Sequence, residues 1–312
     1  MNFSTSALAK TGKQSAIALG CFDGVHLGHS EIISKAVEQA KKDSLLSVVW
    51  SFQTPPKSFF ANKNDPQGLL TTLSEKKKLI RSLNVDTLIC VPFNKNIAKL
   101  SPREFFEDIL ISRLNAKHIF CGFNYRFGYK GSGDVKLLAS LCKEFGIDLT
   151  VLSEIKIENV TVSSTAIRSY LANGEPQKAK NMLGRPFSLR GKVKDGQHLG
   201  RKLGFPTVNQ EVPIDKLLIK NGVYLTRVKF NGKTKFGVTN IGLRPTVQGK
   251  EPICETHILD FKGDLYGKYV TVEFLEFIRS ETKFSNISDL AQQIDQDVIA
   301  AKTLINTKKY VF

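Results

Sequence analysis

The chain has 312 residues, of which 45 are Lys or Arg and 29 are Asp or Glu, so its formal net charge is +16. A content of 41% hydrophobic and 24% charged residues is that of a folded protein, which excludes a disordered chain and leaves room for two domains. The charge favours polyanionic partners, namely nucleic acid, an acidic membrane or a phosphorylated small molecule. No Lys/Arg tract is interleaved with aromatic residues, so we interpret the charge as a solvated basic surface.

The five cysteines stand at wide spacings without a Cys-x-x-Cys pair, so we expect small buried side chains and not metal ligands. They are Cys21, Cys90, Cys121, Cys142 and Cys254. The first residues include Ser, Thr and Lys where a signal peptide needs an apolar segment, and no later run approaches the ~20 apolar residues of a membrane span. We therefore expect a cytoplasmic protein with no membrane partner.

From residue 15 to about 153, apolar runs of strand type alternate with segments of helical periodicity. Strands are predicted near 15–20, 45–52, 85–91, 117–122 and 147–152. Helices are predicted near 28–41, 74–84, 102–115 and 134–145. The second of these helices carries Lys76-Lys77-Lys78, which we expect on a solvated face. The alternation predicts an α/β domain with a parallel sheet, in which ligands bind beyond the carboxyl ends of the strands.

The segment Gly20-Cys21-Phe22-Asp23-Gly24-Val25-His26-Leu27-Gly28-His29 joins the first strand to the first helix. A helix N-terminus offers unpaired N–H groups, and glycines let phosphate oxygens approach the backbone closely. His26 and His29 are three residues apart, so both imidazoles lie on one face of the first turn. Two such histidines are by themselves more often structural, but the glycine-rich turn after a strand favours a nucleotide site in which both donate to phosphate.

Two further segments follow strands at the same predicted edge of the sheet. Phe52-Gln53-Thr54-Pro55-Pro56 forms a stiff loop whose neighbours Phe59 and Phe60 would cover a flat ring, although an ordinary proline loop explains the pattern equally well. Gly122-Phe123-Asn124-Tyr125-Arg126-Phe127-Gly128 places an amide and a cation among aromatic residues. Both segments are candidates for substrate contacts.

The segment Val162-Ser163-Ser164-Thr165-Ala166-Ile167-Arg168 places hydroxyl groups at the start of another helix, where they can cap it or bind phosphate. Arg168, one turn further, adds a cation. Residues 169–183 are predicted helical, interrupted at Gly174 and Pro176, and Leu183-Gly184-Arg185-Pro186 is a predicted hinge. We place the domain boundary there, which divides the chain into residues 1–183 and 184–312.

Beyond the hinge the pattern is that of β-structure. Strands are predicted over Val223–Phe230, Lys233–Ile241, Ile253–Phe261 and Tyr269–Ile278, with Asn231-Gly232 as a hairpin turn between the first two. A final helix is predicted over 286–305, with Ile287, Leu290, Ile294 and Val298 on one face. This half is predicted to be a small antiparallel β-barrel closed by a helix.

Two segments of the second half carry candidate chemistry. Gly200-Arg201-Lys202-Leu203-Gly204-Phe205-Pro206-Thr207-Val208-Asn209 presents a hydroxyl and an amide two residues apart, on one side of an extended chain. Such oxygens suit Mg²⁺, although a structured turn is the simpler explanation from the chemistry alone. In Cys254-Glu255-Thr256-His257-Ile258, alternation places Glu255 and His257 on one face and the other three residues on the opposite face.

The N-terminal motifs resemble those of the prokaryotic bifunctional riboflavin kinase/FAD synthetases. The string Gly20 to His29 is similar to the His-x-Gly-His signature of nucleotidyltransferases, and Ser163 to Arg168 matches the family's Ser-Ser-Thr-x-x-Arg motif. The resemblance implies a modified Rossmann domain that adenylylates FMN with ATP. The nucleotide would lie against Gly20, Phe22, Asp23, Gly24, Gly28, Ser164 and Thr165, with His26, His29 and Arg168 catalytic. Phe52, Asn124 and Arg126 would contact the flavin nucleotide, but Thr54-Pro55-Pro56 replaces a loop in which the family has a histidine.

The second half resembles the riboflavin kinase part of the same family. Pro206-Thr207-Val208-Asn209 is similar to its Pro-Thr-Ala-Asn motif, and Glu255-Thr256-His257 is followed by Asp264-Leu265-Tyr266-Gly267 in the family's order. The resemblance implies that Thr207 and Asn209 hold Mg²⁺, that Glu255 accepts the substrate hydroxyl proton, and that Gly200, Lys202 and Gly204 contact ATP. Riboflavin, FMN and FAD would be substrates or products, with no nucleic-acid partner.

Two other functions remain open at this point. A different adenylyl- or cytidylyltransferase with an accessory barrel would keep the segment from Gly20 to His29, called the histidine turn below. Such an enzyme would need neither metal ligands nor a catalytic base in the second half. A basic nucleic-acid-binding protein would explain the charge of +16 directly.

Overall fold

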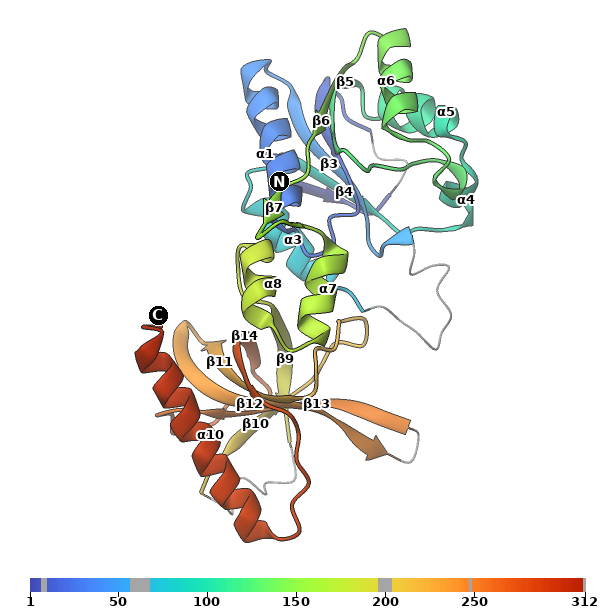
Figure 1. Cartoon of the computed structure of the whole chain (residues 1–312). Helices are drawn as coiled ribbons and strands as arrows, with labels where there is room; N and C mark the ends of the chain where they lie inside the picture. Colours follow the sequence, from blue (N-terminus) through green and yellow to red (C-terminus); the bar gives the residue numbers. More distant parts are fainter. Residues whose placement is uncertain (7–9, 57–67, 196–203, 247–248, 311–312) are drawn as a thin grey trace. The chain divides into compact units, whose positions relative to one another are not determined.

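A computed structural model describes residues 1–6, 10–56, 68–195, 204–246 and 249–310 (Figure 1). The chain forms two compact units, Met1–Ser164 and Thr165–Phe312. The boundary falls at the start of helix α7 (Ser164–Ala172), so α7 and the next helix, α8 (Pro176–Leu183), lie ahead of the predicted hinge but group with the barrel. Gly184 ends α8 with a φ of 72°, a left-handed conformation that glycine adopts without strain.

The first unit contains a six-stranded sheet in the order β1-β4-β3-β2-β5-β6, in which every neighbouring pair is parallel. Its strands are β1 (Asn2–Ser4), β2 (Ser15–Leu19), β3 (Leu46–Phe52), β4 (Thr87–Val91), β5 (Ala116–Gly122) and β6 (Asp148–Leu152). From β2 the chain first builds the sheet outward through β3 and β4, and then returns to the other side of β2 with β5. The reversal confirms the predicted Rossmann type of sheet and places the change of strand order, where such sheets bind ligands, at the carboxyl end of β2.

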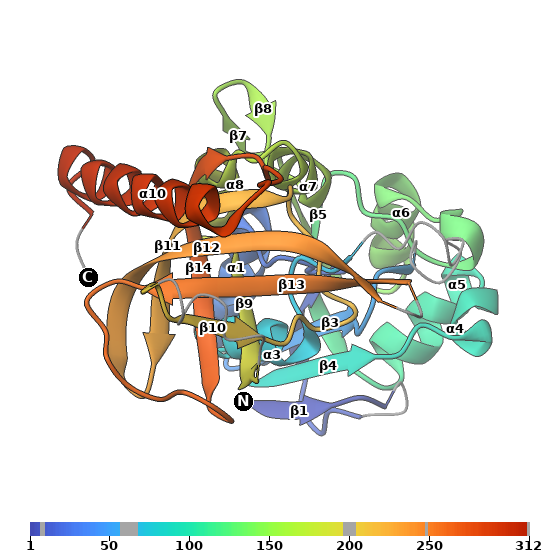
Figure 2. The same cartoon turned by 90° about the horizontal axis from the view of Figure 1, so that it is seen from below.

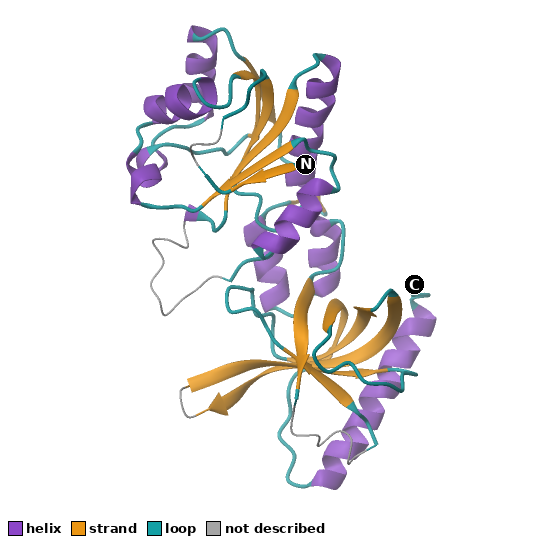
Figure 3. Cartoon of the chain, turned by 180° about the vertical axis from the view of Figure 1, so that it is seen from behind, coloured by secondary structure: helices purple, strands orange, loops and turns teal. Residues whose placement is uncertain are grey.

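Helices cover both faces of this sheet (Figure 3). They are α1 (Leu27–Lys42), α3 (Leu73–Arg81), α4 (Lys95–Lys99), α5 (Pro102–Glu104), the π-helical η1 (Phe105–Ile111), the 3₁₀ turn η2 (Tyr129–Gly131) and α6 (Val135–Glu144). Strand alternation sends Ile17 into the core shared with η1 and α6, and Ala18 into the core shared with α1. A small hairpin, β7 (Lys156–Ile157) with β8 (Val160–Thr161), completes the unit.

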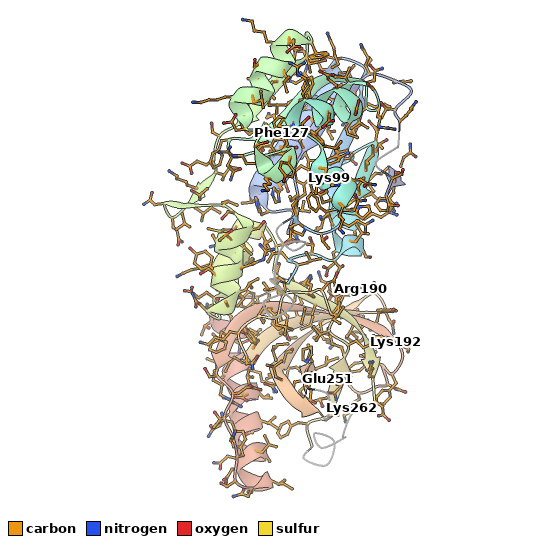
Figure 4. All side chains as sticks on the ribbon, turned by 90° about the vertical axis from the view of Figure 1, so that its right-hand side faces the viewer. Lys99, Phe127, Arg190, Lys192, Glu251 and Lys262 are labelled. Carbon is orange, nitrogen blue, oxygen red and sulfur yellow. The ribbon has the colours of Figure 1, made fainter. Side chains whose placement is uncertain are left out.

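The second unit contains a closed antiparallel barrel in the order β10-β13-β12-β11-β14-β9 (Figure 2). Its strands are β9 (Ser188–Lys194), β10 (Thr207–Gln210), β11 (Gly222–Phe230), β12 (Lys233–Thr246), β13 (Gly249–Ile258) and β14 (Tyr269–Arg279). Asn231 and Gly232 both have positive φ, as a tight hairpin turn requires. On β9, Arg190 and Lys192 point away from the barrel interior (Figure 4), whereas the alternate residues Leu189, Gly191 and Val193 are buried.

Helix α10 (Ile287–Thr307) packs against β11, β12 and β14 on the outside of the barrel (Figure 2). The predicted apolar face is wrong at its first position, because Ile287 is 61% exposed. Packing is concentrated in the second half of the helix, where Val298 and Ala301 join the apolar cluster. Asp297 is buried there and accepts two hydrogen bonds from the Arg279 guanidinium, at 2.7 and 2.8 Å, which fixes the helix to β14.

Four of the five cysteines are buried, as predicted, and none forms a disulfide. Burial raises the pKa of the Cys121 and Cys142 thiols to about 12, so both stay protonated and unreactive near neutral pH. Cys21 departs from the prediction and is only half-buried, because it lies in the turn after β2 and not inside a strand.

Candidate active sites

The histidine turn follows β2 at the point where the strand order reverses. His26 is the N-cap of α1, with φ −75° and ψ 175°, and its Nδ1 accepts a hydrogen bond from the backbone N–H of His29 at 3.3 Å. The two imidazole rings are stacked, with centroids 3.5 Å apart. Because Nδ1 of His26 is an acceptor, its neutral ring carries the proton on Nε2. The structure thus brings the two histidines together at a helix N-terminus, as their spacing predicted.

The residues before His26 pack against other groups of the turn itself. Phe22 is fully buried with a φ of 49°, and its ring lies edge-on to the His29 ring, with centroids 5.2 Å apart. A Cβ on Gly20 would lie 2.8 Å from the Phe22 ring, so glycine is required there by packing. Gly24 has a φ of 85°, and a Cβ on Gly28 would lie 3.4 Å from the His26 ring. These glycines let the turn close around its own aromatic side chains.

Asp23 holds the turn to a second segment of the chain. Its buried carboxylate accepts the backbone N–H groups of Leu70 and Thr71, each at 3.1 Å, and the Thr71 hydroxyl at 3.3 Å. The Thr71 hydroxyl oxygen also accepts the N–H of Gly24 at 3.0 Å. The Ser164 hydroxyl donates to the Asp23 carbonyl oxygen at 2.9 Å, which brings the Ser-Ser-Thr segment to the histidine turn. Thr165 and Arg168 lie further along α7, in the second unit.

Lys76 departs from its predicted place on a solvated face. It is 1% exposed, and its Nζ donates to the carbonyl oxygens of Cys21, at 2.9 Å, and Phe52, at 2.8 Å. Helical periodicity explains the burial, since Ile80, four residues later, is also buried. The spacing of four residues could have predicted the burial of Lys76, but the run of three lysines favoured an exposed face instead.

The other strand-end residues are more open. Phe52 ends β3 and packs edge-on against Trp50 and Phe93. Asn124 and Arg126 are exposed in the turn after β5, and the Arg126 guanidinium lies 3.9 Å from the Asp134 carboxylate. Phe59 and Phe60 lie outside the described residues, as do Gly200 and Lys202. Gly204 is described and has a φ of 82°.

The candidate site of the barrel is a row of polar residues on adjacent strands. Thr207 of β10 lies opposite His257 of β13, and Asn209 lies opposite Glu255. The neighbours Cys254, Thr256 and Ile258 are buried, whereas Glu255 and His257 are partly exposed, as alternation predicted. Among the described residues, the Thr207 hydroxyl and the Asn209 amide have no hydrogen-bond partner, so both oxygens are available to a ligand.

Asn240 completes this row and was missed in the sequence. It lies opposite Glu255 on the other neighbouring strand, β12, so Glu255 stands between two asparagines. No motif marked Asn240, because its place depends on the strand register. The ring Nδ1 of His257 donates to the Pro206 carbonyl oxygen at 2.9 Å, which ties β13 to the start of β10.

A pocket of about 290 Å³ opens beside Thr207. Its wall combines the Pro206–Val208 segment with the segment after β13, which contributes Phe261, Lys262, Gly263, Asp264, Leu265 and Tyr266. The N–H of Tyr266 donates to the Asp264 carboxylate at 2.8 Å and closes the turn. Aromatic, cationic and acidic groups therefore surround one cavity next to the polar row.

Comparison with known proteins finds a family match for each half of the chain. Residues 8–166 match the FAD synthetase family, and residues 183–305 match the riboflavin kinase family. The bifunctional riboflavin kinase/FMN adenylyltransferase of Buchnera aphidicola from Schizaphis graminum is 36% identical over 303 residues, covering 96% of both chains. The protein of that name from Escherichia coli K12 is 36% identical over 295 residues, covering 94% of this chain and 93% of its own. The chain belongs to the bifunctional riboflavin kinase/FMN adenylyltransferase family.

A solved structure described as a macrolide-efflux protein from Streptococcus pneumoniae shares this fold. It is 30% identical, covers 96% of this chain and 98% of its own, and superposes with a TM-score of 0.87. Among the residues that the structure of this chain describes, no helix is long and apolar enough to cross a membrane.

Proposed function

We propose that residues 1–183 adenylylate FMN and residues 184–312 phosphorylate riboflavin, each reaction using its own ATP. The observation that carries the proposal is that each unit holds a separate polar site: the stacked histidines at the carboxyl end of β2, and the row of Asn209, Glu255 and Asn240 on the barrel. We further propose a cytoplasmic enzyme whose partners are these small molecules and not nucleic acid.

For the kinase reaction we assign Glu255 as the base. Its carboxylate would accept the proton of the riboflavin 5′-hydroxyl as that oxygen attacks the γ-phosphorus of ATP and ADP leaves. Thr207 and Asn209 would hold Mg²⁺, because their oxygens are the hard donors that this ion takes alongside nucleotide phosphates. When bound, the ion would neutralise phosphate charge.

The pocket beside Thr207 is our candidate for the nucleotide of the kinase reaction. Phe261 and Tyr266 line it with aromatic surface on which a base can pack, and Lys262 supplies a cation for phosphate. Gly204 precedes the Pro206–Val208 wall, and Gly200 and Lys202 are proposed to act with it.

For the adenylyl transfer, an oxygen of the FMN phosphate would attack the α-phosphorus of ATP, and pyrophosphate would leave without a covalent enzyme intermediate. His26 and His29 would donate hydrogen bonds to the charge that develops on the triphosphate, supported by the N-terminus of α1. Ser164, Thr165 and Arg168 would hold the pyrophosphate. Phe52, Asn124 and Arg126 are proposed to contact FMN.

The nucleotide site would be shaped mainly by residues that fix the conformation of the histidine turn, since Phe22 and Asp23 are buried among protein groups. These residues are Gly20, Phe22, Asp23, Gly24 and Gly28.

The test of the whole proposal is to incubate the purified chain with riboflavin, ATP and Mg²⁺ and to separate the flavins by chromatography. FMN should appear first and FAD later. If neither product formed, the proposed function would be wrong.

A further inference from the structure

Helix α3 carries three consecutive lysines in three different environments. Lys78 is exposed, and Lys77 is half-buried with its Nζ 3.9 Å from the centroid of the Phe3 ring. Lys76 is among the largest fully buried side chains of the molecule. Burial of a lysine is unfavourable unless its amino group is well partnered, and an apolar side chain would fill the same space without that cost.

The partners of Lys76 lie where the ladder between β2 and β3 stops. The parallel register runs from Ser15–Leu46 to Leu19–Trp50, after which Gly20 N–H reaches the Trp50 carbonyl only at 3.4 Å. Beyond that point the Lys76 Nζ joins the Cys21 carbonyl to the Phe52 carbonyl. The lysine therefore continues, by a side chain, the strand pairing that the backbone no longer provides.

No acidic side chain forms an ion pair with Lys76 among the residues that the structure describes. Its two hydrogen bonds are both to carbonyl oxygens, and the Cys21 carbonyl also accepts the Ser51 hydroxyl at 2.9 Å. The ammonium thus fixes the backbone of the turn and does not neutralise a carboxylate.

The turn that Lys76 fixes leads directly to the histidines. Cys21 is followed by Phe22, whose left-handed backbone conformation admits little freedom and whose ring lies against the His29 ring. A shift of the Cys21 carbonyl would therefore move Phe22, and with it the His29 ring that stacks on His26.

We propose that Lys76 is a positioning residue for adenylyl transfer, which clamps the turn after β2 to the end of β3 so that His26 and His29 meet the triphosphate in the productive geometry. This inference rests on the proposed function of the histidine turn. Lys76 touches no reacting atom in this account. It acts through the Cys21 carbonyl and the Phe22 ring.

The direct test replaces Lys76 by Met, which keeps the length and apolar stem but removes every donor. Lys78→Met is the matched control, because it makes the same chemical change at an exposed position of the same helix. Trp50, the single tryptophan of the chain, lies buried in β3, two residues before Phe52, whose carbonyl oxygen Lys76 contacts. Its fluorescence therefore reports the folded fraction of the first unit alone.

For Lys76→Met we expect kcat for FAD formation from FMN to fall by ~10²-fold per folded protein, as a small misplacement of catalytic groups does. The KM for ATP should change by less than about threefold, because the histidines act mainly in the transition state. Riboflavin phosphorylation should be unchanged, and Lys78→Met should behave as wild type. A folded Lys76→Met variant with wild-type kcat would overturn the proposal.

Chemical rescue provides the second arm. Lys76→Ala removes the atoms of a propylammonium group, so added n-propylammonium should restore FAD formation in a saturable way, whereas 1-propanol or tetramethylammonium should not. A loss of activity that only follows the unfolded fraction in both variants, without rescue, would show a purely structural lysine and overturn the proposal. A wild-type chain that makes no FAD from FMN would instead contradict the proposed function.

Discussion

Asn209 and Glu255 lie directly opposite each other in the antiparallel ladder between β10 and β13. Residues paired in this way project to the same face of the sheet, with Cβ atoms about 5 Å apart. Asn240 occupies the equivalent place on β12, so an amide, a carboxylate and a second amide form a row across three strands. The row brings the proposed metal ligand next to the proposed base, although 46 positions separate Asn209 from Glu255 in the chain.

Glu255→Gln is the sharpest variant of this row, because the amide keeps the shape of the side chain and loses its basicity. If Glu255 is the base, riboflavin phosphorylation should fall by ~10²–10⁴-fold. Conversion of supplied FMN to FAD should be spared, since it takes place at the other site. A loss of only a few-fold would show that Glu255 orients the hydroxyl and does not take its proton, and equal loss of both activities would indicate misfolding.

Asn209→Ala tests the metal ligand. Removing one oxygen donor should raise the Mg²⁺ concentration needed for half-maximal phosphorylation by ~10-fold or more, because the ion keeps fewer protein ligands. A Mg²⁺ titration of both reactions in the same preparation measures this effect, and FAD formation from FMN is the internal control. An unchanged Mg²⁺ dependence of the kinase would remove Asn209 from the metal site.

His29→Ala tests the histidine turn. Loss of one preorganised donor should lower FMN adenylylation by ~10²–10³-fold, while phosphorylation continues and FMN accumulates. The backbone N–H of His29 still reaches His26 in this variant, so the N-cap of α1 is preserved. A normal rate of FAD formation would leave His29 with a role in packing against Phe22 only.

His118 makes the first unit sensitive to acid. Burial lowers its pKa below the ordinary value of 6.5, and the nearby Asp148 and Asp43 only partly oppose this shift. The unfolded chain therefore binds a proton more readily than the folded one, so stability is lost as pH falls from about 6.5. Urea unfolding followed by Trp50 fluorescence should show a smaller loss between pH 7.5 and 5.5 in His118→Gln. An equal loss of unfolding free energy in the wild type and in His118→Gln would contradict this role of His118.

Periodicity was sufficient to predict most of the fold. The predicted strands and helices follow from patterns that recur every two or 3.6 residues, and the structure confirms a parallel sheet and an antiparallel barrel. The strands β1, β7, β8, β9 and β10 were missed: all but β9 span two to four residues and carry no periodicity, and Gly191 interrupts the apolar alternation of β9. Ile287 was misplaced because a pattern cannot show where a helix extends beyond its partner strands.

The sites were harder to predict where a role depends on tertiary contacts. His26 and His29 could be paired from local spacing, but Asn240 reaches Glu255 only through the strand register, and Lys76 is hidden within a charge run. The buried Asp23 carboxylate accepts the backbone N–H groups of Leu70 and Thr71, which lie 47 and 48 positions away, and the sequence did not predict these partners. Such partners are set by folding and leave no local pattern.

The most direct test of the account follows the fate of labelled phosphate from ATP. With riboflavin as substrate, label in the γ-phosphate should appear in FMN and then in FAD, because the kinase transfers that group to the flavin. Label in the α-phosphate should appear only in FAD and never in FMN, because it arrives with AMP. Label from the α-phosphate in a product the size of FMN, or FAD without label from the γ-phosphate, would contradict two separate transfers on this chain.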